Sequence, residues 1–194
     1  MAAEIIFIKE GYARKKNDGW DVNSAICLIK SDGKYVLCDP GCNRTLLEQS
    51  LKDNSINYDD IDIVFLSHNH IDHILLSGLF AKAEIYSYEN YIYKNDKLRE
   101  LKHSYITNDI KRIYTPGHCL EHYSLIINTD IARFCFAADV FWFEDNEEAI
   151  IDVFKEDPFV ESADMLQKLI ASRQYVVNHS DVIIPGHGKI IKNY

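Results

Sequence analysis

One six-residue stretch of the chain concentrates side chains that bind metal ions. Residues 68–73 read His-Asn-His-Ile-Asp-His, which places three imidazoles and one carboxylate close together. In an extended segment His68 and His70 point to the same side and can hold one ion, whereas Asp72 and His73 follow a turn of the chain and can reach a second. Surface solubility would favour lysine and glutamate, and a core would not gather four polar groups. The stretch therefore predicts a metal site.

Three later positions each add one possible ligand at the end of an apolar run. His118 and His187 both follow a Pro-Gly pair, and Asp139 follows the run 136–138. Glycine lets the backbone bend closely around an ion, and proline stiffens the approach. Alone, each is an ordinary turn or a helix cap. Their joint occurrence after the first motif strengthens the prediction.

The elements that must position these residues can be read from turn formers and apolar runs. We expect strands over 4–8, 24–29, 34–39, 61–66, 110–114, 122–128, 131–138 and 181–185. Asp32-Gly33 indicates a hairpin turn, Asn43 is a plausible N-cap for a helix to about 52, and a second helix is expected over about 162–177. Two groups of strands with helices between them suggest two packed sheets, although periodicity alone does not separate this from other α+β arrangements.

With these motifs, residues 22–190 resemble the metallo-β-lactamase superfamily. Its His-x-His-x-Asp-His motif matches 68–73, and Asp39 in Cys-Asp-Pro-Gly resembles its buried aspartate-glycine motif. The resemblance implies an α/β (α+β) fold, an αββα sandwich: two mixed β-sheets packed face to face, helices on both outer faces, and metals at one edge. We expect one such domain over 1–194, similar to the small members of the MBLAC type.

The resemblance also implies how the ligands divide. The first ion would be held by His68, His70 and His118, and the second by Asp72, His73 and His187, with Asp139 bridging them. The implied cofactors are two zinc ions, with iron or manganese as alternatives. The implied reaction is attack by a hydroxide that bridges the two metals on an ester, thioester, lactone or phosphoester. Asp72 is the predicted catalytic residue, because it can also accept a hydrogen bond from that hydroxide.

Other functions remain open. A metal-dependent nuclease of the same superfold is the main alternative, and an iron-dependent dioxygenase is less favoured because the second ligand set is complete. A non-catalytic, metal-stabilised protein is hard to reconcile with ligands for two ions. The net charge of −9 argues against a nucleic-acid partner, since affinity for nucleic acid comes largely from neutralised phosphates. The basic residues near 94–112 are diluted by acidic ones, so a small-molecule substrate is favoured.

The sequence also bears on the compartment. No apolar run approaches the roughly 20 residues that span a bilayer, and the apolar patch at 5–8 is too short for a signal peptide. We therefore expect a cytoplasmic protein with no membrane partner and five reduced cysteines. Near the site, we expect Cys119 to pack behind its neighbouring ligand, His122 to be a rim or supporting residue, and the aromatic residues 141–143 to be core. The position of Tyr194 and the oligomeric state are not predicted.

Overall fold

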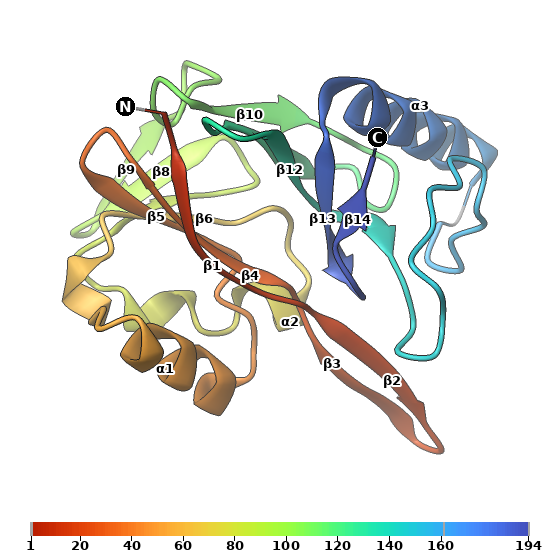
Figure 1. Cartoon of the computed structure of the whole chain (residues 1–194), viewed down its shortest axis with the longest axis horizontal. Coiled ribbons are helices and arrows are strands. Elements are labelled where there is room, and N and C mark those ends of the chain that lie inside the picture. Colours follow the sequence, from red (N-terminus) through yellow and green to blue (C-terminus); the bar gives the residue numbers. More distant parts are fainter. Residues whose placement is uncertain (1, 161, 194) are drawn as a thin grey trace.

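Two mixed β-sheets packed face to face form the body of the protein (Figure 1). We describe a computed structural model, which covers residues 2–160 and 162–193. The first sheet has the strand order β1-β4-β5-β6-β7-β8-β9. Its strands are β1 (Glu4–Lys9), β4 (Ile26–Ser31), β5 (Lys34–Cys38), β6 (Ile63–Phe65), β7 (Glu84–Tyr86), β8 (Tyr91–Lys94) and β9 (Lys97–Glu100).

The second sheet has the order β10-β11-β12-β13-β14, and a separate hairpin of two strands projects from the body. The strands of this second sheet are β10 (Ile110–Tyr114), β11 (Tyr123–Asn128), β12 (Arg133–Trp142), β13 (Val182–His187) and β14 (Ile191–Lys192). The hairpin consists of β2 (Tyr12–Lys16) and β3 (Gly19–Asn23), and Figure 1 shows it extending away from both sheets.

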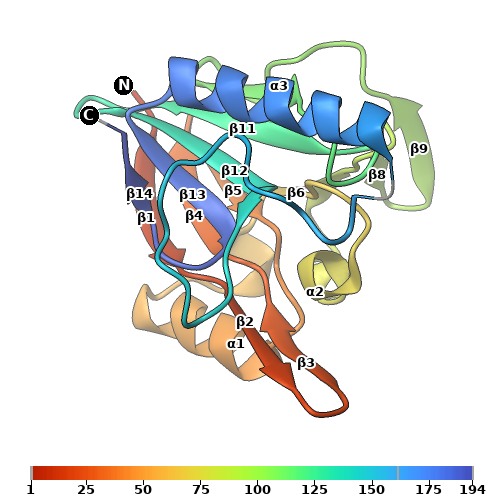
Figure 2. The same cartoon turned by 90° about the vertical axis from the view of Figure 1, so that its right-hand side faces the viewer.

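Helices cover both outer faces, so the predicted αββα arrangement is confirmed. Helix α1 (Arg44–Asp53) lies on the first sheet and α3 (Ala163–His179) on the second, at opposite ends of the view in Figure 2. Asn43 is the N-cap of α1 as expected, and Ser162 caps α3: the side chain of each accepts a hydrogen bond from the third backbone N–H of its helix. Three shorter helical turns are η1 (Tyr58–Asp60), α2 (Ile71–Ile74) and η2 (Ser77–Leu79).

The apolar side chains form three layers that follow this architecture. Between the sheets, Phe65 packs with residues such as Leu125 and Phe136. Leu47 of α1 belongs to the layer outside the first sheet, and Leu169 of α3 to the layer outside the second. Since each sheet buries both faces, the sheets are rigid supports for side chains at their edges.

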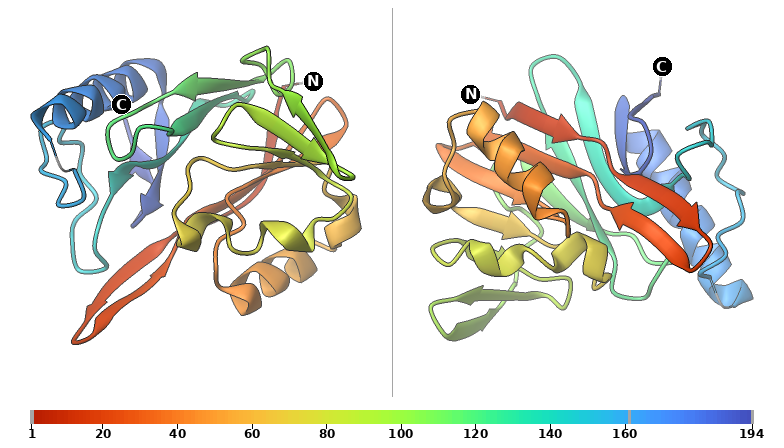
Figure 3. Two further views of the ribbon diagram at one scale, coloured as in Figure 1. Left: turned by 180° about the vertical axis from the view of Figure 1, so that it is seen from behind. Right: turned by 90° about the horizontal axis from the view of Figure 1, so that it is seen from below.

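The candidate ligands gather at one edge of this sandwich, most of them at or after strand ends, with Asp139 inside β12. The parallel pairs β5–β6 and β12–β13 point the same way within their sheets, so their carboxyl ends bring distant parts of the chain together. The back and lower views in Figure 3 show the hairpin leaving the body beside this edge. Among the described residues, no helix combines the length and apolarity needed to cross a bilayer.

The structure differs from the predicted elements in two places that matter for the site. The β2–β3 hairpin was not predicted, because most of its residues are exposed and it lacks an alternating apolar pattern. Strand β12 continues to Trp142, four residues beyond the predicted end. Ala138 has φ = 47°, and the pairing of β12 with β13 shifts register around it, so an irregularity allows the strand to continue.

Candidate metal centre

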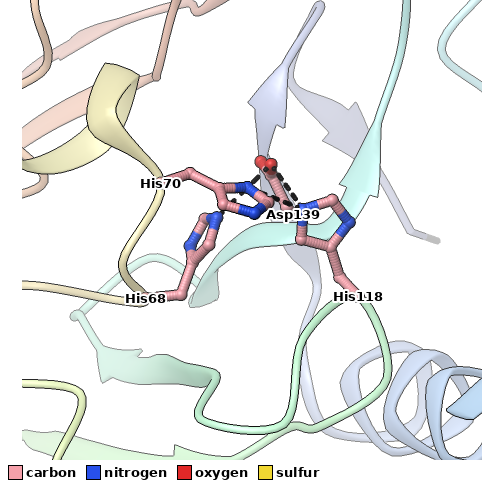
Figure 4. Close-up of side chains that lie close together, drawn as sticks. All are labelled: His68, His70, His118 and Asp139. Carbon is pink, nitrogen blue, oxygen red and sulfur yellow. Dashed lines mark hydrogen bonds and ion pairs between the residues drawn. The ribbon is translucent and has the colours of Figure 1, made fainter. Parts of the chain in front are cut away.

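All seven predicted ligands meet at the sheet edge, in two adjoining groups. The potential ligand atoms of His68, His70, His118 and Asp139 lie within 4.8 Å of one another, and so do those of Asp72, His73 and His187. Figure 4 shows the first group converging from the loop after β6, the loop before β11 and strand β12. Asp72 and His73 lie on the short helix α2, and His187 ends β13.

Asp139 lies between the two groups and presents one oxygen to each. Its Oδ2 is 3.6 Å from His68 Nε2 and 3.3 Å from His118 Nε2. Its Oδ1 is 3.3 Å from His73 Nε2 and 3.6 Å from His187 Nε2. This is the arrangement expected of a carboxylate that bridges two ions.

The spaces between these atoms fit metal ions better than hydrogen bonds. His68 Nε2, His73 Nε2 and Asp139 Oδ1 are buried without a hydrogen-bond partner, although buried polar atoms are normally paired. Ligands at about 2.0–2.1 Å from a tetrahedral zinc ion are about 3.3–3.4 Å apart, which is close to the separations around Asp139. Imidazole nitrogens with carboxylate oxygens are also a donor set that zinc accepts. The residues present therefore fit a pair of such ions.

A buried carboxylate holds ligands of both groups in orientation. Asp39, which is fully buried, accepts from His73 Nδ1 at 2.7 Å and from the Ser67 hydroxyl at 2.6 Å and backbone N–H at 2.8 Å. Because the single Ser67 hydroxyl proton goes to Asp39, its oxygen accepts from His68 Nδ1 at 2.9 Å. In both histidines the Nε2 lone pair is thereby directed into the centre.

The two other buried candidate ligands, His118 and His187, are oriented by the second half of the chain and by the hairpin, respectively. His118 Nδ1 lies 3.0 Å from Oδ2 of the buried Asp157. His187 Nδ1 faces two backbone carbonyls, those of Tyr12 at 3.2 Å and Asn23 at 3.1 Å. Carboxylate and carbonyl oxygens can only accept here, so each histidine donates through Nδ1 and turns Nε2 toward the centre, where His118 Nε2 lies 3.1 Å from His70 Nδ1.

The electrostatics of the cluster favour positive charge at its centre. Burial alone would lower the pKa of His73 and His187, but the charge of Asp139 raises the pKa of His73 well above its usual range and that of His187 to about 9. Burial would raise the pKa of Asp139, whereas His73 and His187 hold it well below its usual range. The pKa of His68 is lowered by burial and by His73. An ionised Asp139 therefore attracts protons or metal cations.

Comparison with known proteins shows which family the chain resembles. A model of the metallo-β-lactamase superfamily matches residues 19–91. Metallo-beta-lactamase domain-containing protein 1 of Xenopus laevis is 27% identical over 205 residues, covering 95% of this chain and 80% of the frog protein. Both comparisons thus show that the chain is similar to members of the metallo-β-lactamase superfamily. It spans only 61% and 55% of the rat and mouse proteins of the same name.

Solved structures agree with the fold. A Thermotoga maritima protein assigned to the metallo-β-lactamases superposes with a TM-score of 0.70 at 20% identity, covering 98% of both chains. AidC, a dizinc quorum-quenching lactonase, superposes with a TM-score of 0.60 at 20% identity, covering 88% of this chain and 74% of the lactonase. At these identities the likeness concerns the metallo-β-lactamase fold alone.

Two glycines let this metallo-β-lactamase-fold chain close around its centre. A Cβ at Gly186 would lie 1.8 Å from Asp139 Oδ1, inside the space of the carboxylate oxygen. Gly117 has φ = 140° and lies against the backbone of Leu169 in α3, where a Cβ would be 2.3 Å away. The Pro-Gly pairs before His118 and His187 are thus explained by close approach of the backbone.

A pocket of about 300 Å³ opens over the centre. Five of its lining residues are candidate ligands, and the other six are apolar. Trp142, which we expected in the core, lines this pocket, whereas Phe141 and Phe143 are buried in the layer under α3. Successive side chains of a strand point to opposite faces, which explains why Trp142 differs from its two neighbours.

Sequence reasoning missed one supporting residue and placed others only approximately. Asp157 was not singled out, because no spacing rule links it to His118. His122 is fully buried, lies 3.0 Å from the Thr115 hydroxyl through Nδ1, and packs beside the ring of His68, so it is an inner supporting residue and not a rim residue. Cys119 is partly exposed and, like the other four cysteines, free. Tyr194 lies outside the described residues.

Proposed function

We propose that the chain is a metal-dependent hydrolase that holds two ions, most favourably zinc, in the two ligand groups. The observation that carries this proposal is the set of buried, unpartnered atoms around Asp139: His68 Nε2, His73 Nε2 and Asp139 Oδ1. Leaving three such atoms without partners would cost several kcal/mol in the absence of cations, at roughly 1–3 kcal/mol each. The dizinc lactonase of the same fold supports zinc as the metal.

The reaction proposed is the hydrolysis of an ester, thioester, lactone or phosphoester, in which one water is consumed and two products are released. Two bound cations would supply Lewis acidity, lowering the pKa of a water and polarising the bond that it attacks. Asp72 lines the pocket, and its Oδ2 is 3.3 Å from His187 Nε2. Burial alone would raise the pKa of Asp72, but its contact with His187 lowers it, so the carboxylate is ionised and can accept a hydrogen bond from the attacking water.

Metal content and turnover on the same preparation test the proposal. Protein purified without chelators should contain about two zinc-like ions per chain by mass spectrometry, and it should hydrolyse members of a panel of chromogenic esters, lactones and phosphodiesters. Chelation should remove both metal and turnover, and added zinc should restore them. A metal-replete preparation that holds well under one ion per chain would overturn the two-ion centre. A preparation that holds two ions per chain but turns over no substrate of the panel would overturn the proposed hydrolase function.

A further inference from the structure

The pocket over the ligands has a wall of three aromatic rings from three segments. Trp20 of β3 meets Trp142 at the end of β12 edge to face, with centroids 6.5 Å apart. Trp142 in turn lies 5.5 Å from Phe159, and Phe159 lies 6.0 Å from the ring of His118. We call Trp20, Trp142 and Phe159 the aromatic wall. It runs without a break from the hairpin to a candidate ligand.

The rest of the pocket offers nothing that would bind a charged substituent. Apart from the aromatic wall and the five candidate ligands, the lining residues are Ala13, Val22 and Ile71. Within the part of the chain that the structure describes, no lysine or arginine lines this pocket. Apart from the indole N–H groups of Trp20 and Trp142, its polar side chains therefore belong to the candidate metal centre, and its sides are apolar.

Two cations near the aromatic wall, Lys155 and Arg14, are engaged elsewhere, and a third, Lys15, lies over the ring of Trp20 at 5.9 Å from its centroid. The Lys155 ammonium donates to the Trp142 carbonyl at 2.9 Å and pairs with Glu147 at 2.6 Å. Arg14 pairs with Asp145. These groups can stabilise the rings through cation–π contacts, as Lys155 does over Trp142, but none of them is a pocket residue.

The wall is anchored, so it does not have to form when a ligand enters. Asp145 accepts from the Ala13 N–H at 3.2 Å and donates its own N–H to the Ala13 carbonyl at 3.0 Å, which ties the hairpin to the segment after β12. The buried Arg173 of α3 donates to the carbonyls of Val140 and Lys155 and so fixes the segment that carries Phe159. A preformed apolar surface binds without an ordering cost.

We propose that this pocket selects uncharged acyl substrates, with an apolar chain packed on the aromatic wall beside the bond to be cleaved. The inference rests on the proposed hydrolase function and narrows its substrate class to neutral esters, thioesters and lactones. A carboxylate against the wall would lose hydration without gaining a cationic partner, whereas each methylene gains by burial. An oligonucleotide is disfavoured as well, because its flanking phosphates would meet no cation in the pocket.

A matched pair of esters tests the charge selectivity. 4-Nitrophenyl hexanoate and mono-4-nitrophenyl adipate have the same chain length and leaving group, but the adipate ends in a carboxylate. Hydrolysis of each consumes one water and releases 4-nitrophenol and the acid. We expect kcat/KM to be at least tenfold higher for the hexanoate and to rise about threefold per methylene from acetate to hexanoate. Nonproductive binding of the carboxylate leaves kcat/KM unaffected, so equal values for the pair would overturn the proposal. Faster cleavage of a single-stranded oligonucleotide than of any ester would overturn it too.

Substitution of the wall assigns the effect to its residues. Phe159→Ala and Trp20→Ala should each lower the ratio of hexanoate to acetate kcat/KM by about fivefold or more, since the chain loses its contact surface. Phe154→Ala is the matched control, because Phe154 lies in the same segment as Phe159, is 67% exposed, and is not a lining residue. Unchanged ratios in both wall variants, or an equal loss in the control, would contradict the assignment.

Tryptophan fluorescence gives a measurement independent of turnover. The chain has two tryptophans, and both belong to the aromatic wall. Hexanamide should shift the emission of the metal-loaded protein saturably, acetamide at the same concentrations should not, and Phe159→Ala should weaken the hexanamide response. If no ester is hydrolysed while hexanamide still binds, the proposed hydrolase function would be wrong, and the proposal that the pocket binds apolar chains would stand. If esters are hydrolysed but neither turnover nor fluorescence depends on chain length, the hydrolase proposal would stand and the apolar-pocket proposal would be wrong.

Discussion

The two ligand groups of the metal centre are supported in different ways. In the second group, His73 is held by the fully buried Asp39 and His187 by backbone carbonyls of the hairpin strands. In the first group, His118 is held by Asp157, a side chain on the long segment between β12 and α3. The second group is thus oriented by a fully buried carboxylate and by backbone carbonyls. The first depends more on a segment whose position is set by packing against α3.

Asp39→Ala should have the largest effect, because Asp39 supports His73 directly and His68 through Ser67. The free energy of unfolding should fall by about 3 kcal/mol or more, since three buried donors lose their acceptor. Urea denaturation of the chelated protein followed by circular dichroism measures this. Asp53→Ala, at an exposed position of α1, is the control and should change little. A loss under about 1 kcal/mol would mean that Asp39 is not the shared support.

Asp72→Ala removes a ligand of the second group and the predicted acceptor for the attacking water. The fold should persist by circular dichroism, because Asp72 lies in the pocket lining and outside the core. Turnover should fall by about 10²-fold or more, and the second ion should be lost first in a chelator titration. A variant that unfolds, or one that keeps full metal and full activity, would rule out this role.

Asp157→Asn probes the support of the first group alone. It keeps the shape of the side chain but replaces the charged acceptor of His118, so affinity for one ion should fall by about 10- to 100-fold while the other ion stays bound. Competition with a chromogenic chelator separates the two affinities. Glu156→Gln changes an exposed neighbouring carboxylate and should leave both affinities as they are. An equal weakening of both ions would show that the groups are not independent.

Ser67→Ala should have the smallest effect. It tests how far the orientation of His68 by Ser67 depends on Asp39. Loss of the hydroxyl leaves His68 Nδ1 without its acceptor and should cost about 1–2 kcal/mol of unfolding free energy. In the background of Asp39→Ala the same change should cost much less, because the two residues form one network. Additive losses in this double-mutant cycle would contradict a relay from Asp39 to His68.

The sequence predicted the parts of the centre that depend on local order. Residues 68–73 supply four ligands from one stretch, and the two Pro-Gly-His segments, one after β10 and one at the end of β13, adjoin apolar runs that could be recognised. Asp157 was missed because its contact with His118 joins residues 39 positions apart and depends on how the segment before α3 packs. The exposed hairpin with Trp20 was missed because exposed strands lack the apolar pattern on which such predictions rest.

The distribution of the ligands along the chain has a consequence for biosynthesis. During translation, residues 68–73 emerge long before His187, which ends β13. A nascent chain therefore cannot complete the second ligand group until most of the protein has been made and β13 has paired beside β12. Metal loading then joins segments that are far apart in the chain and acts as a reversible cross-link. The loaded protein should consequently unfold more slowly than the chelated one, which gives it kinetic stability as well as a reactive centre.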